Sequence, residues 1–238
     1  LSTHIGAHYG PASLSLFDQG TAEERRIRLP EKLRPMMAAM PDLKALAVTG
    51  HFTLGWLRDE HLLRFGDVAF STLRDPVNMA ISKVNFLLTW LVAPETPSMP
   101  GIVEWLNDLG LQIPTTALAD EELRQLGRNL LYQQRTVSPN TLCQFLGRGS
   151  ADSALDLCAS SNIELTTVGR YSHWLRERWG IETTRRINES RPFLRLGDLT
   201  AQDHDYLHDI TDEDRRLLAL VEAALEKRQS CSILGSQL

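Results

Sequence analysis

The stretch from Ser71 to Ser82 places an arginine, a helix start and a serine where an anion could bind. Asp75-Pro76 is typical of a helix start, because aspartate caps free amides and proline needs no N–H at the first helical position. A helix N-terminus attracts anions, and the planar guanidinium of Arg74 suits phosphate oxygens. Ser82 follows Arg74 by about two helical turns, so its hydroxyl could face the same phosphate. The alternative is that Arg74 pairs with Asp75 or another carboxylate, and that Ser82 is only a small packing residue.

His51 is the candidate general base. It follows Gly50, which ends the apolar run at residues 45–48. An imidazole titrates near neutrality and can take a proton from a reacting hydroxyl. The alternative is a buried histidine that is bonded to the backbone after a strand.

Two weaker groups lie near the end of the chain. A basic cluster surrounds Asn188 and could close over a nucleotide, meet an anionic acceptor or be a solvated loop; its members are Arg185, Arg186, Arg191 and Arg195. His204 and His208 are flanked by aspartates, so on one helix they could meet a metal. The alternative for this pair is an acidic, solvated helix start.

These residues need a scaffold, and short apolar segments alternate with helical patterns along the chain. Strands are predicted at 45–48, 68–73 and 165–168. Helices are predicted at 76–92, 120–134, 138–146, 150–161 and 171–179, with two closing helices capped by Thr200 and Thr211. This alternation predicts an α/β fold with a mostly parallel sheet.

The composition is that of an ordinary globular protein. The chain has 238 residues, a net charge of −5, 42% hydrophobic residues and 23% charged residues, which excludes a disordered or collagen-like chain and argues against general DNA coating. Its longest apolar run is too short for a membrane helix, and no signal peptide is visible. Three cysteines without a CxxC pair indicate neither a disulfide framework nor a zinc knuckle. GxxxxGK[ST] and GxSxG are both absent, which disfavours a nucleoside triphosphatase and an α/β-hydrolase.

The stretch around Arg74 resembles the 3′-phosphate-binding motif of sulfotransferases that use 3′-phosphoadenosine 5′-phosphosulfate (PAPS). It is most similar to the carbohydrate (heparan sulfate 2-O-like) sulfotransferases and their bacterial relatives. Arg74 and Ser82 match the phosphate ligands of that motif, whereas Asn78 and Met79 replace its acidic–arginine pair. His51 matches the Gly-His element in which the family has its base.

Further motifs follow in the family's order over roughly residues 45–225. One resembles Asn-x-Gln-x-Arg-x-Leu, with Leu142 and Gln144 in place of its glutamine and arginine. The others are Thr167–Arg170, Trp174-Leu175, Trp179–Ile181, Ile187–Ser190, Asp198–Thr200 and Asp214–Leu218.

The resemblance implies one sulfotransferase-like domain over residues 1–238, with a P-loop-like architecture of three layers in which helices flank a central, mostly parallel sheet. The N-terminal strand and the phosphosulfate loop of that domain could be missing from these residues. It would transfer a sulfuryl group from PAPS, its donor substrate, to a hydroxyl of a carbohydrate. His51 would be the base, and Arg74, Ser82 and Arg191 would contact the nucleotide. We expect no bound metal, no nucleic-acid partner and no membrane span. We expect the protein to be located in the cytoplasm.

The family's phosphosulfate loop, with its lysine, has no clear counterpart. The four lysines are Lys32, Lys44, Lys83 and Lys227, and none lies in such a loop. The most similar segment is residues 4–14, which leaves two interpretations: the loop is degenerate, or the true loop precedes Leu1. The alternative function is therefore a catalytically degenerate nucleotide-binding or interaction module. A kinase-like phosphotransferase is a third interpretation, but the chain lacks its motif.

Overall fold

A computed structural model describes residues 13–15, 47–49, 54, 69–92, 106–112, 117–183 and 191–235. At residues 13–15, 47–49 and 228–235 it describes the backbone alone. Strands β1 (Ser13–Ser15) and β2 (Ala47–Thr49) pair in parallel. Strands β3 (Ala69–Leu73) and β4 (Ile163–Thr167) form a second parallel pair, with Leu73 opposite Thr167. The predicted α/β class and parallel pairing are confirmed at this level.

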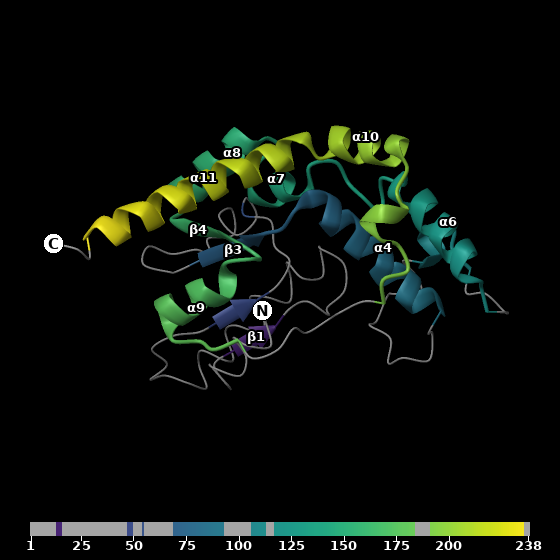
Figure 1. Cartoon of the computed structure of the whole chain (residues 1–238), viewed down its shortest axis with the longest axis horizontal. Helices are drawn as coiled ribbons and strands as arrows, with labels where there is room; N and C mark the ends of the chain where they lie inside the picture. The colour runs from purple at the N-terminus through teal and green to yellow at the C-terminus, as the bar shows by residue number, and fades with distance from the viewer. Residues whose placement is uncertain are drawn as a thin grey trace.

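Helices cover both sides of the β3–β4 pair. The helices α8 (Ala151–Ser160) and α11 (Asp212–Gly235) contact β4, and α9 (Tyr171–Trp179) contacts it from the other side (Figure 1). Gly180 ends α9 in a left-handed conformation with φ 64°, as predicted for a C-cap. Within the described residues, no helix combines the length and the apolar character needed to cross a membrane.

The helix α4 (Pro76–Val92) has the predicted bounds. Its start is capped by Asp75, whose Oδ1 accepts the Asn78 backbone N–H at 2.8 Å. One side of α4 is buried and packs against α6 (Asp120–Leu131). The core that they share contains Val84, Leu87, Leu88, Leu91, Leu123, Leu130 and Leu194.

Further helical elements follow α6 in the second half of the chain. Among them are α7 (Thr141–Leu146), the 3-10 turn η2 (Leu196–Asp198) and α10 (Ala201–Ile210). Helix α7 begins later than predicted because Asn140 is left-handed, with φ 45°. Thr200 caps α10 as predicted, since its hydroxyl accepts the Asp203 N–H and the Asp203 carboxylate accepts the Thr200 N–H.

The helices α7 and α11 cap each other. The Asn140 side-chain oxygen accepts the N–H groups of Glu213 (3.1 Å) and Asp214 (3.3 Å). In return, the buried Asp214 carboxylate accepts the N–H groups of Leu142 (3.0 Å) and Cys143 (2.8 Å). This exchange satisfies amides that a helix start would otherwise leave unpaired.

Thr211 stands at the N-cap position of α11, as predicted, but its side chain does not cap the helix. Thr211 is buried, and its hydroxyl donates to the Leu207 carbonyl at 2.6 Å. Asn140 takes its place as the acceptor for the α11 amides. A side chain from a distant part of the chain has replaced the local cap.

Helices α7 and α8 pack closely at Gly147. A Cβ atom at this position would lie 2.6 Å from the backbone nitrogen of Ala154. The Glu213 carboxylate accepts the Ala151 N–H at 2.7 Å, so the start of α8 is also held by α11. The starts of α7 and α8 are therefore both tied to the start of α11.

Candidate functional site

The carboxyl ends of β3 and β4 lie side by side. Leu73 ends β3 and accepts the Val168 N–H at 2.8 Å just after β4 ends. Arg74 follows Leu73 directly, and Arg170 follows at the start of α9. In open α/β sheets, ligands bind at this edge of neighbouring parallel strands. Arg74 and Arg170 therefore lie close to the edge at which such sheets bind ligands.

Arg74 is exposed at this edge. Within the described part of the chain, its guanidinium has no hydrogen bond and no ion pair. The Asp75 carboxylate is used instead by the first turn of α4, through Asn78. The alternative pairing between Arg74 and Asp75 is therefore not found, and Arg74 keeps all of its donors for a ligand.

Ser82 lies further along α4 and is half-buried. It follows the exposed Asn78 by one turn, so the two share a face of the helix. The rise of an α-helix places Ser82 about 9 Å from Pro76 along the axis. The side chains of Arg74 and Ser82 are not joined by a hydrogen bond in the described part of the chain. One phosphate would reach both only if the long Arg74 side chain lay along the helix.

Lys83 follows Ser82 and is a residue that the sequence interpretation did not assign to the site. Its side chain is half-buried, and burial lowers the pKa of its ammonium group. A lysine among the apolar residues of α4 was the signal that could have marked it.

Several predicted positions cannot be compared with the structure. His51, Asn188 and the loop-like text at residues 4–12 lie outside the described residues, as do Arg185 and Arg186. The predictions for these residues stay predictions.

Arg191 is described, and it lies against α6. Its Nη2 atom is 3.5 Å from Oδ1 of Asp120, and its guanidinium carbon is 4.9 Å from the ring centre of Phe193. Within the described residues, no contact joins Arg191 to Arg74 or Ser82. The structure therefore brings Arg191 together with a different set of residues.

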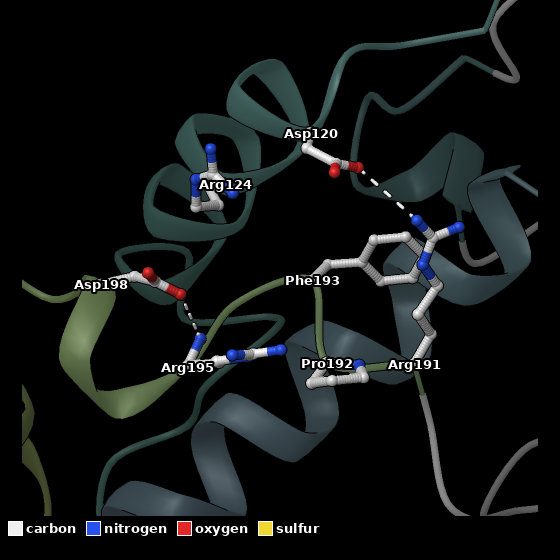
Figure 2. Close-up of a pocket in the computed structure, with 7 residues that line it drawn as sticks. All are labelled: Asp120, Arg124, Arg191, Pro192, Phe193, Arg195 and Asp198. Carbon is white, nitrogen blue, oxygen red and sulfur yellow. Dashed lines mark hydrogen bonds and ion pairs between the residues drawn. The ribbon is translucent and has the colours of Figure 1, made fainter.

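Those residues line a pocket between α6 and the segment 191–198 (Figure 2). Its volume is about 360 Å³, and its lining is Asp120, Arg124, Arg191, Pro192, Phe193, Arg195 and Asp198. Arg124 was not predicted as a site residue. Its exposed position on an amphipathic helix gave no signal that it would meet a basic segment from elsewhere in the chain.

The described histidine pair and cysteines do not form a reactive site. The rings of His204 and His208 lie 6.4 Å apart, and the described residues contain no group of three side chains placed to hold a metal ion. Cys143 and Cys158 are free and buried. Burial, with the nearby Asp214 carboxylate, raises the pKa of Cys143, and burial raises that of Cys158 to about 11. Neither is a reactive thiolate at neutral pH.

Comparison of the chain with protein-family models, with curated proteins and with solved structures finds no match.

Proposed function

We propose that this chain is a PAPS-dependent sulfotransferase that transfers a sulfuryl group to a hydroxyl of a carbohydrate. The observation that carries the proposal is the exposed Arg74, whose donors are unused within the described residues, between the end of β3 and the start of α4. This is the position of the 3′-phosphate ligand in the motif that the sequence resembles. Arg74 and Ser82 are the proposed phosphate ligands.

The finer architecture is part of the proposal. In the sulfotransferase fold, helices on two sides flank a central, mostly parallel sheet. Two parallel strand pairs, and helices on both sides of β3 and β4, support this arrangement.

The proposed reaction is a displacement at sulfur. The acceptor oxygen attacks the sulfur of PAPS, an O–S bond forms, and the bond from sulfur to the 5′-phosphate oxygen breaks with its electrons leaving on the phosphate. His51 would take the proton of the acceptor hydroxyl. Arg74 and Ser82 would fix the nucleotide by its 3′-phosphate and so hold the sulfur near the acceptor. The role of Arg191 as a further nucleotide contact stays a prediction.

A second function is a nucleotide-binding or interaction module that has lost catalysis. It is favoured by the lysines, since none lies in a loop like that of the family. Lys83 lies within α4 and Lys227 within α11, so neither described lysine can serve as a phosphosulfate-loop lysine. This module would keep Arg74 and bind the nucleotide without transferring the sulfuryl group.

A transfer assay with labelled PAPS and a panel of mono- and oligosaccharides separates the two functions. The sulfotransferase predicts labelled product, reduced about 10²- to 10⁴-fold in His51→Ala. His173→Ala is the matched control, because His173 is exposed on α9 and, among the described residues, its ion pair is with Glu177. Nucleotide binding without product would support the second function. The absence of both binding and product would overturn the two together.

A further inference from the structure

The pocket between α6 and the segment 191–198 has guanidinium groups that the protein itself uses only in part. Within the described residues, the Arg195 guanidinium has no partner, while its backbone N–H donates to the Asp198 carboxylate at 2.7 Å. Arg124 is bound to Glu121 through two hydrogen bonds of 2.7 and 3.0 Å. The Arg195 guanidinium is therefore available to a ligand. The Arg124 guanidinium is already bound to Glu121, a residue that does not line the pocket.

Arg191 is the third guanidinium, and its pairing is weak. Its 3.5 Å separation from Asp120 is longer than the 2.7–2.9 Å of a charge-assisted hydrogen bond. Both side chains are about two thirds exposed, at 65% and 70%, so the pair contributes little and can exchange. Phe193 lies under the guanidinium and orients it (Figure 2).

The backbone that carries these arginines is fixed by buried contacts. The Asn85 amide of α4 donates to the Leu194 carbonyl and accepts the Leu194 N–H, each at 2.8 Å. Phe193 and Leu194 are 7% and 1% exposed. A site that is held in place before binding loses less conformational freedom when a ligand binds.

We propose that this pocket binds an oxyanion, the carboxylate or phosphate group of a small molecule, separately from the β3–α4 turn. Arg195 would donate to it with its free guanidinium, and Arg191 would exchange Asp120 for it. The planar forks of both side chains suit carboxylate and phosphate oxygens alike. The pocket volume, about 360 Å³, lies in the range of small-molecule sites. The proposal does not depend on sulfotransferase activity.

The test is a calorimetric titration of the full chain with citrate and, separately, with inorganic phosphate. We expect saturable binding of at least one anion at this pocket, and the titrations are repeated in Arg74→Ala because Arg74 is itself a proposed phosphate ligand. Arg195→Ala and Arg191→Ala should each weaken it about tenfold or more, because each removes a charged donor. Citrate alone would identify a carboxylate site, and phosphate alone a phosphate site. Both arginines are exposed, so neither variant should alter the thermal unfolding of the chain.

Two control variants make the result decisive. Arg176→Ala removes the same charge from the exposed surface of α9, where Arg176 pairs with Glu182, and should leave binding unchanged. In Arg74→Ala, which removes the proposed phosphate ligand of the β3–α4 turn, binding at the pocket should persist. The inference is overturned if neither anion binds saturably, if Arg176→Ala weakens binding as much as Arg195→Ala does, or if Arg74→Ala abolishes it. It is also overturned if Arg191→Ala and Arg195→Ala weaken binding of adenosine 3′,5′-bisphosphate as much as Arg74→Ala does, because the pocket would then belong to the nucleotide site.

Discussion

The start of α11 and the start of α4 use polar side chains in opposite ways. At α11, the carboxylates of Glu213 and Asp214 are drawn inward and accept the amides of two other helices. At α4, Asp75 closes only its own first turn, and Arg74 stays exposed with its donors unused within the described residues. The first arrangement consumes its hydrogen-bonding capacity inside the protein, and the second keeps it for a ligand.

The motifs that resemble the sulfotransferase family fall into two groups by this difference, those whose polar residues serve as helix caps and those whose polar residues stay exposed. Asn140 and Asp214 belong to two of those motifs, and in the structure they cap each other's helices. Their position in the resemblance therefore has a structural explanation that needs no ligand. Arg74 has no such explanation, which is why the functional proposal depends on it.

The largest effect is expected from Asp214→Ala. The change removes the acceptor for two amides and leaves them buried, at a cost of about 3 kcal/mol in the free energy of unfolding. Urea unfolding measures it. Nucleotide affinity of the folded protein should not change, because Asp214 caps α7 and does not lie at the β3–α4 turn.

Asp152→Ala is the matched control for this prediction. Asp152 pairs with Arg216 at 2.8 Å, but its side chain is 66% exposed. Loss of an exposed ion pair costs less than about 1 kcal/mol. Equal destabilisation by the two substitutions would contradict the distinction between buried caps and surface charges.

A smaller effect is expected from pH, through a second closed network. The Asp203 carboxylate accepts from Arg128, Tyr132 and Thr200 at 2.7–2.8 Å. Burial alone would raise the pKa of Asp203, but these hydrogen bonds together hold it well below its ordinary value of 3.8. The unfolded chain therefore takes up this proton first as the pH falls. The stabilisation is present above about pH 4 and is lost below it.

Urea unfolding between about pH 6 and pH 3 tests this prediction. Asp203→Asn should lower stability at pH 6 and flatten the loss on the acid side. Asp214 should not cause a loss of stability at acid pH, because burial raises the pKa of its carboxyl group. Protonation of Asp214 as the pH falls therefore favours the folded state. An acid slope that is unchanged in Asp203→Asn would show that the network does not hold the carboxylate charged.

Features set by neighbouring residues could be predicted from the sequence. Asp75-Pro76 located the start of α4, Gly180 the end of α9, and Thr200 the start of α10. In each case the residue acts on the backbone within its own turn, so the signal and its effect are adjacent. The position of Arg74 after a strand and before a helix followed from the same local signals.

Features that depend on distant partners could not be predicted. Asn140 and Asp214 are 74 residues apart, and Asn85 and Leu194 are 109 residues apart. The sequence around one residue of each pair does not indicate its partner, since asparagine and aspartate suit many turns and caps equally well. The pocket was missed for the same reason, because it forms only where α6 meets the segment that Asn85 holds.

The nucleotide site proposed at the β3–α4 turn can be tested by calorimetric titration with adenosine 3′,5′-bisphosphate, the desulfated product. We expect binding that is weakened about 100-fold by Arg74→Ala and about tenfold by Ser82→Ala, in proportion to the charged and neutral donors removed. Arg176→Ala, with the same loss of charge on α9, should bind as the unaltered chain does. Binding that survives Arg74→Ala unchanged would show that the nucleotide is not held at the β3–α4 turn.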